Sequence, residues 1–174
     1  ALRGYGILDS PTDGVFDDFV QIAAQVCGAP ISVVNLVVES RQWFAAEIGL
    51  GVRETPLDIS ICAHAILQPG VFVVPDLTED RRFDCNPLVA GDPNLRFYAG
   101  ALLETPEGLP LGTMCVLDVH PRPDGLTEQQ IFTLKALARQ VMAQLELRRA
   151  LAEKQLLVLE AHHRHVKPLA RRRL

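Results

Sequence analysis

The segment SICAHAI, residues 60–66, places a thiol and an imidazole two positions apart among small apolar residues. Cys62 and His64 are of types that serve as nucleophile and base in cysteine enzymes and as ligands of zinc. The flanking alanines favour a short helix over 61–67, on which residues two apart point about 200° away from each other. The two side chains therefore cannot meet one metal ion, and catalysis would need partners distant in sequence. We expect a structural or pocket-lining role.

The four cysteines are well separated, and no pair has the short spacing of a zinc site, so we expect no metal centre. Cys27, Cys62 and Cys115 lie in apolar sequence, whereas Cys85 does not. This setting favours free and mostly buried thiols, although an even count leaves disulfides as the alternative.

Two adjacent aromatic pairs lie on predicted strands. Trp43 and Phe44 must point to opposite faces of one strand, and Phe97 and Tyr98 to opposite faces of another. One member of each pair is therefore expected in the core, and the other toward the middle segment or solvent.

Three charged residues are weaker candidates for a site. Asp76 ends a predicted strand, where an aspartate usually caps a turn. Arg53 and Arg96 have the charge to hold an anionic ligand, but surface arginines are common.

Hydrophobic periodicity predicts a helix, two hairpins around an irregular middle segment, and a long final helix. Two strand pairs are joined by turns too short for crossovers, which predicts an α+β fold with an antiparallel sheet. We expect helices to flank this sheet and residues 50–95 to cover one of its faces. The expected elements are a helix at 14–27, strands at 31–38, 41–49, 71–76, 95–104 and 111–118, and a helix from 127 to about 160.

The net charge of −4 conceals an asymmetry along the chain. Residues 148–174 hold eight Lys and Arg against two Asp and Glu, whereas residues 1–147 hold nine against nineteen. The pattern predicts an acidic globular domain, 1–147, and a basic helical extension, 148–174. The acidic domain argues against nucleic acid as a partner. The sequence shows neither a long apolar run nor a secretion signal, so we expect a cytoplasmic location and no membrane span.

The final helix carries two apolar stripes. Its first half has a seam of apolar residues spaced by three and four positions. Near Arg148 this register fails, and a shifted stripe continues with Leu147, Leu151 and Val158. A helix over 127–160 would be roughly 50 Å long, more than a domain of this size covers. We expect a homodimer through a parallel coiled coil of 127–160; the alternative is a single helix folded back on the sheet. The seam consists of Ile131, Leu134, Ala138, Val141 and Leu145.

Three segments resemble GAF domains of bacterial sensor proteins: ISVVNLVVESRQWFAAEIGLGVRETPLDISICAHAI, VFVVPDLTEDRRFDCNPLV and LRFYAGALLETPEGLPLGTMCVLD. The similarity covers about residues 1–150. It implies a PAS-like antiparallel sheet with terminal helices on one face, a small-molecule pocket on the other, and a long C-terminal helix. It leaves the ligand and any cofactor unspecified. The candidate pocket residues are Trp43, Arg53, Asp58, Cys62, His64, Asp76, Phe97, Tyr98 and Cys115.

The tail segment LLVLEAHHRHVKPLA is similar to the phosphoacceptor segment of HWE-type histidine kinases. The resemblance makes His163 the phosphorylated histidine and implies a two-component phosphorelay with a downstream kinase domain. The chain departs from the pattern by the extra His165 and by Pro168, which replaces an asparagine. A basic, fraying helix end is the alternative interpretation.

Other members of the fold suggest three further hypotheses. The first is an input domain of a cyclic-di-nucleotide cyclase or phosphodiesterase. The second is a free methionine sulfoxide reductase that uses Cys62, Cys85 and Cys115 as attacking and resolving thiols. The third is a photoreceptor with a bilin attached to Cys62 or Cys85.

Overall fold

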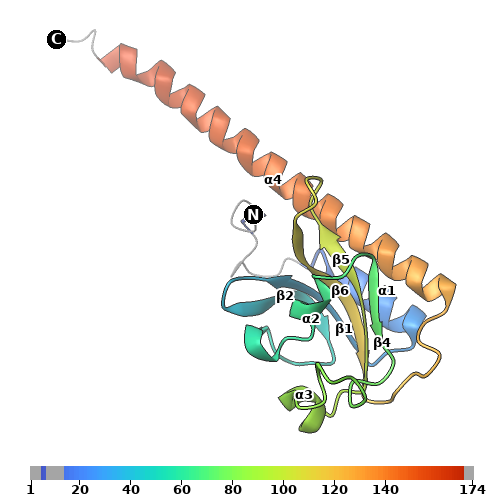
Figure 1. The fold of residues 1–174 in the computed structure, drawn as a ribbon. Helices are drawn as coiled ribbons and strands as arrows, with labels where there is room; N and C mark the ends of the chain where they lie inside the picture. The colour runs from blue at the N-terminus through green and yellow to red at the C-terminus, as the bar shows by residue number, and fades with distance from the viewer. Residues whose placement is uncertain (1–4, 7–13, 171–174) are drawn as a thin grey trace.

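The computed structural model describes residues 5, 6 and 14–170, with side chains through residue 164. Its centre is one six-stranded antiparallel sheet in the order β3-β2-β1-β6-β5-β4 (Figure 1). The expected α+β class with an antiparallel sheet is confirmed. The strands are β1 Ile31–Val37, β2 Arg41–Ile48, β3 Glu54–Pro56, β4 Val71–Val74, β5 Phe97–Glu104 and β6 Pro110–Asp118.

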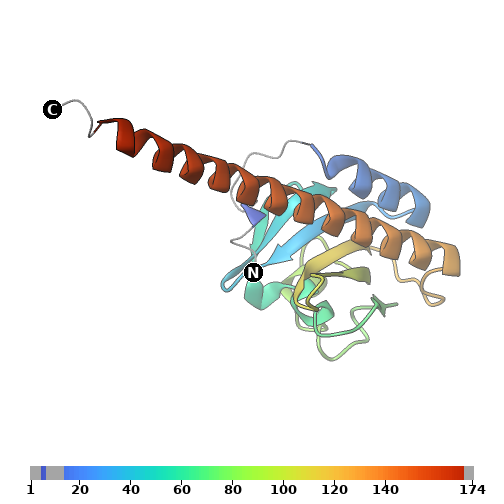
Figure 2. The ribbon, with the colours of Figure 1, turned by 90° about the horizontal axis from the view of Figure 1, so that it is seen from above.

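The two faces of the sheet carry different coverings (Figures 1 and 2). The helices α1, Asp17–Cys27, and α4, Glu128–Ala170, pack on one face. The short helices α2, Cys62–Ala65, and α3, Pro87–Ala90, lie on the other face with their connecting loops. We call this second covering, the part of residues 50–95 outside β3 and β4, the roof. The molecule therefore has two hydrophobic cores that share one sheet.

Helix α1 packs one apolar face against the sheet. Val20 and Ala23 are buried, but Val26 is 38% exposed and the neighbouring Cys27 is buried in its place. The helix ends at Gly28, whose φ of 58° is left-handed and lets its N–H reach the preceding carbonyls.

Helix α4 begins with a capping box formed by Thr127 and Gln130. The Thr127 N–H donates to Gln130 Oε1 over 2.9 Å, and the Gln130 N–H donates to Thr127 Oγ1 over 3.2 Å. The first-half seam, however, belongs to the domain's own core: Leu134, Val141 and Leu145 are fully buried against the sheet and α1. These residues are therefore not free to form the coiled-coil seam that the spacing suggested.

The second half of α4 projects away from the domain (Figures 1 and 2). The helix has 43 residues, which corresponds to about 64 Å. From residue 150 to 164 every side chain is exposed. None of the helices in the described chain combines the length and apolarity that a membrane span requires.

The middle segment contains three elements that the periodicity missed. They are β3, the 3-10 turn η2, Leu57–Ile59, and α3. Each has three or four residues, too few for a periodic pattern to appear in the sequence. In α3 the start is set locally, because the Asn86 side chain accepts from the Leu88 N–H over 2.9 Å.

Arg122, in the loop between β6 and α4, fastens three elements together. Its guanidinium donates to the carbonyl of Cys27 and, over 2.9 Å, to that of Gly28, at the end of α1. It also pairs with the Asp118 carboxylate and lies 5.0 Å over the ring of Phe97. One cation thus satisfies free carbonyls at a helix end and positions the loop from which α4 starts.

We predict that Arg122→Ala lowers the free energy of unfolding by about 2 kcal/mol, because it removes charge-assisted hydrogen bonds and leaves Asp118 without this partner. Urea unfolding followed by circular dichroism measures the change. Arg139→Ala, at an exposed position of α4, should change the value by less than about 0.5 kcal/mol. Equal effects of the two variants would contradict this role of Arg122.

Candidate functional site

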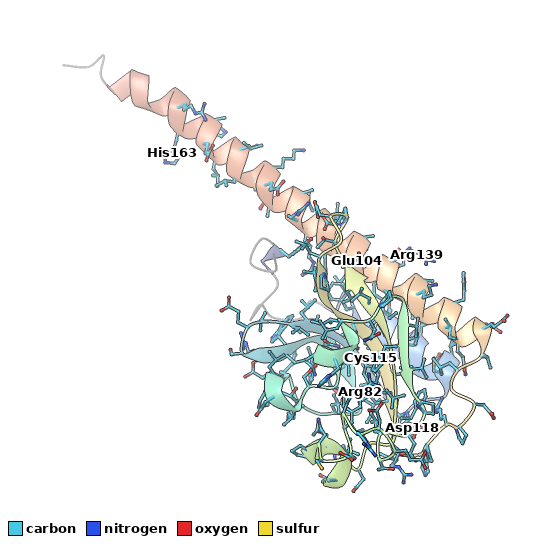
Figure 3. The ribbon with its side chains drawn as sticks, viewed as in Figure 1. Arg82, Glu104, Cys115, Asp118, Arg139 and His163 are labelled. Carbon is cyan, nitrogen blue, oxygen red and sulfur yellow. The ribbon has the colours of Figure 1, made fainter. Side chains whose placement is uncertain are left out.

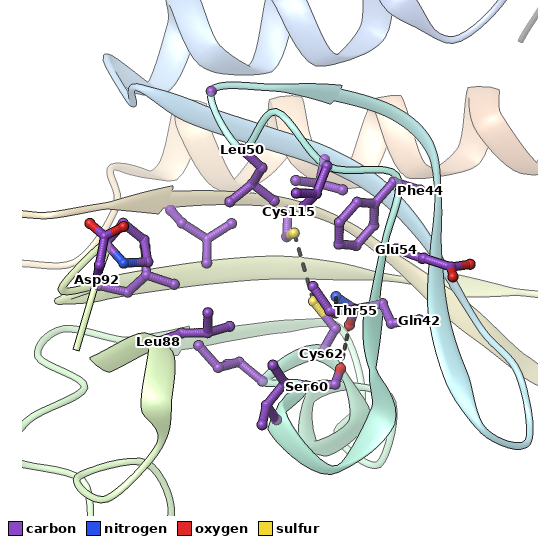
Figure 4. Close-up of a pocket in the computed structure, with 18 residues that line it drawn as sticks. Gln42, Phe44, Leu50, Glu54, Thr55, Ser60, Cys62, Leu88, Asp92 and Cys115 are labelled. Carbon is purple, nitrogen blue, oxygen red and sulfur yellow. Dashed lines mark hydrogen bonds between the residues drawn. The ribbon is translucent and has the colours of Figure 1, made fainter. Parts of the chain in front are cut away.

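A cavity of about 300 Å³ lies between the sheet and the roof (Figure 4). Its inner wall is apolar and comes from Val33 of β1, Phe44 of β2 and Leu117 of β6. Leu50 and Leu88 close it from the roof, as Figure 4 shows. A space of this size accepts a small organic molecule.

One side of the cavity carries neutral polar groups. The Ser60 hydroxyl donates to Gln42 Oε1, and Gln42 Nε2 donates to Thr55 Oγ1 over 3.3 Å. Ser60 Oγ also accepts from the Ala63 N–H over 3.0 Å, which fixes the first turn of α2. These contacts tie α2 to the edge of the sheet and leave amide and hydroxyl groups beside the cavity.

The charge at the cavity is negative. Glu54 and Asp92 are exposed on its rim, and no Lys, Arg or His is among the described residues that line it. Arg41, outside the lining, pairs with Glu54, which leaves the Asp92 carboxylate as the net charge of the rim. With no cation in the described lining to receive an anionic ligand, the cavity suits a neutral or cationic molecule with a large apolar part.

Two thiols form the inner end of the cavity. Cys62 of α2 and Cys115 of β6 are both buried, and their Sγ atoms are 3.9 Å apart (Figure 4). The Tyr98 hydroxyl donates to Cys62 Sγ over 3.3 Å and lies 3.2 Å from Thr113 Oγ1. We call Asn35, Cys62, Tyr98, Thr113 and Cys115 the thiol cluster.

The surroundings of the two thiols shift their pKa values in opposite directions. Burial raises the pKa of Cys62, but hydrogen bonds outweigh burial and lower it, with that from Cys115 the largest, followed by that from Thr113. The pKa of Cys115 is raised well above its ordinary value by its hydrogen bond to Cys62 and by burial. Cys62 is therefore the sulfur that ionises first.

A glycine on β5 makes room for the Tyr98 ring. A Cβ at Gly100 would collide with the Tyr98 hydroxyl, because residues two apart share a face of a strand. Burial raises the pKa of Tyr98 well above 10, so this hydroxyl stays protonated and available as a donor.

The candidate aromatic residues divide between the two faces. Trp43 and Phe97 pack in the core beneath α1 and α4, so they lie on the face opposite to this cavity. Their neighbours Phe44 and Tyr98 face the roof. Alternation along the strand predicted the split but could not say which member faced the cavity.

The other candidates also separate. Of the nine predicted pocket residues, Cys62 and Cys115 line the cavity, and Tyr98 adjoins it through Cys62. His64 is exposed, with its ring edge-on to Phe83 at 5.1 Å, so it points away from Cys62 as expected. Asp58 is exposed on η2 and does not line the cavity.

The predicted anion-binding arginines lie elsewhere. Arg53 borders a separate depression with Asp17 and Glu47. Arg96 makes a bidentate ion pair with Asp76, with Nε 2.8 Å from Oδ1. Asp76 also accepts from the Thr78 N–H over 3.0 Å, so it caps the turn after β4.

His163 stands far from the cavity, on the projecting part of α4 (Figure 3). Its Nδ1 lies 3.3 Å from the Leu159 carbonyl, and Glu160 pairs with Arg164 over 3.7 Å. The helical backbone continues past Pro168 to Ala170. Within the described residues no cluster of three or more His, Cys, Asp or Glu could hold a metal.

Sequence reasoning missed several residues of the site. Gln42 alternates with Phe44 on one face of a buried strand, and Asn35 interrupts an otherwise apolar strand. A polar residue at such a position is a signal for a buried hydrogen-bonded site. Thr55, Ser60 and Asp92 gave no comparable signal, because they lie in irregular segments.

An antiparallel sheet with a long terminal helix on one face and a roofed cavity on the other defines a sensory-domain type of fold. The GAF domain family matches residues 11–145, and the chain belongs to this family.

A curated relative, the cyclic di-GMP phosphodiesterase PA2567 of Pseudomonas aeruginosa, is 46% identical over 140 residues. The match covers 80% of this chain but only 24% of that protein, so the chain spans about a quarter of its length.

Several solved structures share the fold. The GAF domain of an Acinetobacter phosphoenolpyruvate-protein phosphotransferase superposes with a TM-score of 0.65 at 17% identity, over 86% of this chain and 92% of that one. A domain described as part of a Sinorhizobium meliloti sensor histidine kinase gives 0.62 at 16%, over 84% and 99%. The free methionine-R-sulfoxide reductase of Neisseria meningitidis gives 0.62 at 18%, over 86% and 87%. At these identities the likeness establishes the fold alone.

The Asp76–Arg96 pair predicts a loss of stability in acid. The hydrogen bond from Arg96 holds the pKa of Asp76 well below its ordinary value of about 3.9. The folded state thus binds this proton more weakly than the unfolded chain, so the stabilisation is complete above about pH 4 and is lost as the pH falls further. Urea unfolding between pH 7 and pH 3 should show wild type and Asp76→Asn converging below pH 4. Asp58→Asn, at an exposed position, should follow the wild-type profile; a constant difference for Asp76→Asn would contradict the assignment.

Proposed function

We propose that this chain is a sensory input domain that binds a small, largely apolar, neutral or cationic molecule and transmits its occupancy through α4. The observation that carries the proposal is the cavity, with its apolar wall, neutral polar groups and negative rim. A ligand there would contact the sheet on the face opposite to α4.

The sheet offers a direct mechanical route from cavity to helix. Strand β6 lends Cys115 and Leu117 to the cavity, while Met114 and Val116 of the same strand pack in the core beneath α4. A close-packed wall one strand thick transmits displacement, because core side chains have no free volume to absorb it. Two packing states that differ by a few kcal/mol suffice for a switch.

The output that we favour is cyclic di-GMP turnover. Its support is the relative with 46% identity, which is named as a cyclic di-GMP phosphodiesterase. A histidine kinase output rests on the tail resemblance at His163 and on a structural neighbour with 16% identity. The negative rim argues that the cyclic dinucleotide, a dianion, is not the cavity ligand.

Assays on the purified full-length protein separate the two outputs. Hydrolysis of cyclic di-GMP that responds to a cavity ligand supports the proposal. ATP-dependent labelling that His163→Gln abolishes would instead assign a kinase output. Native mass spectrometry of the purified chain would report any retained small molecule.

The cavity makes a prediction with two probes of similar shape and different charge. Neutral N-phenyl-1-naphthylamine should bind with a fluorescence increase, and its sulfonated relative 8-anilinonaphthalene-1-sulfonate should bind roughly tenfold more weakly, an electrostatic difference of about 1.4 kcal/mol. Leu88→Trp places an indole in the cavity and should abolish the neutral probe's signal. Leu67→Trp, at a 73% exposed position outside the cavity, should leave it unchanged. Equal affinity for both probes would refute the inferred ligand class.

We further propose that the projecting half of α4 pairs with a second copy of the chain. Leu147, Leu151 and Val158 lie on one side of the helix and are at least half exposed. This half of α4 does not pack against the domain, so its row of exposed apolar side chains can be buried only by a partner helix. We place the pairing beyond Leu145, because the first half of α4 packs in the core of its own domain.

Substitution in this stripe should weaken the dimer selectively. Leu151→Glu puts a charge in each copy of the seam and should raise the dimer dissociation constant at least roughly tenfold in analytical ultracentrifugation. Leu156→Glu is the matched control, because at about 100° per residue Leu156 lies on the far side of the helix. A wild-type chain that stays monomeric at high concentration would disprove the pairing.

A further inference from the structure

The thiol cluster brings together two cysteines that are 53 positions apart in the chain, one on the roof and one on the sheet. Their Sγ atoms are 3.9 Å apart, whereas a disulfide has an S–S length of about 2.05 Å. A shift of about 2 Å in a four-residue helix at the edge of a cavity is therefore enough to join them. The proposed sensory function does not require two thiols at the inner end of the cavity.

The surroundings of the pair resemble those of reactive rather than inert buried thiols. Hydrogen bonds directed at Cys62 lower its pKa despite its burial, and the Tyr98 hydroxyl contacts the sulfur over 3.3 Å. Asn35 Nδ2 lies 3.9 Å from Cys115 Sγ and holds that sulfur beside its neighbour. One thiol is thus favoured as the thiolate nucleophile, and the other stays protonated beside it.

The cavity gives small molecules a route to these sulfurs. Both cysteines line it, and its rim at Val52, Glu54 and Asp92 is exposed. The apolar wall and negative rim favour an uncharged oxidant over an anionic one.

We propose that Cys62 and Cys115 form a redox-active dithiol, which small uncharged hydroperoxides oxidise to an intramolecular disulfide. The Cys62 thiolate attacks the terminal oxygen of ROOH, the O–O bond breaks, and RO⁻ takes up a proton and leaves as ROH. The Cys115 sulfur then attacks the Cys62 sulfenic acid, the S–O bond breaks, and hydroxide leaves with the Cys115 proton as water. In sum, two thiols and ROOH give a disulfide, ROH and water. This chemistry goes beyond the proposed ligand sensing and does not depend on it.

The exposed Cys85 provides an internal comparison. It is accessible, but the neighbouring Asp84 raises its pKa, by a hydrogen bond first and by charge repulsion second. Exposure favours oxidation of Cys85, whereas thiolate character favours oxidation of Cys62. The cysteine that peroxide oxidises therefore shows which of the two properties controls reactivity.

The test begins with the reduced 174-residue wild-type chain and one equivalent of hydrogen peroxide. After denaturing alkylation, two of the four thiols should be lost, with a mass decrease of two hydrogens, and peptide mapping should find Cys62 linked to Cys115. Cys85→Ser should give the same linkage at an unchanged rate. Cys115→Ser should stop at a sulfenic acid on Cys62 that dimedone traps, and Cys62→Ser should leave Cys115 reduced.

Several results would overturn the proposal. They are oxidation confined to Cys85, a disulfide that includes Cys27 or Cys85, dimedone labelling of Cys115 in Cys62→Ser, or retention of all four thiols. If the serine variants do not fold, peptide mapping of the wild-type chain and of Cys85→Ser decides. If peroxide forms the Cys62–Cys115 disulfide but the chain does not bind N-phenyl-1-naphthylamine, the result counts against the sensory proposal only.

Discussion

The structure depends on the strict alternation of side chains along the central strands. Phe97 and Tyr98 are neighbours in sequence, yet one packs under α4 and the other under the roof. Met114 and Cys115 are divided in the same way. A slip of one residue in register would exchange the two sets and fill each core with the other's side chains. Because both cores are made by the same strands, neither the cavity nor the seat of α4 can form without the other.

The thiol cluster is an exception within this apolar architecture. Asn35 and Thr113 are fully buried, and Asn35 Oδ1 has no hydrogen-bond partner among the described residues. Such an oxygen costs about 1–3 kcal/mol, which a valine or leucine at the same place would avoid. Buried polar groups that are not optimal for stability are typical of sites with a chemical role. The cluster occupies the middle of the sheet, where the strands are held most rigidly and its geometry is best defined.

Much of the fold could be predicted because the signals were local and periodic. The hairpins and the roofed sheet followed from alternation, turn length and the family resemblance. The site could be predicted less well, because it is made of long-range pairs. Cys115 reads as an apolar strand residue, and only the fold brings Cys62 beside it. The apolar seam on α4 was correctly located but assigned to the wrong partner, since periodicity shows that a face is covered and not what covers it.

The loop anchored by Arg122 has a consequence for the geometry of any output. The guanidinium fixes the start of α4 to the end of α1 and to β6, while the other end of the helix extends unsupported beyond the domain (Figure 2). A rigid rod that is pivoted at one end moves most at the other. A small rotation of the sheet would therefore produce a much larger lateral displacement at the distal end of α4. The length of the projecting part of the helix would set how much the displacement is amplified.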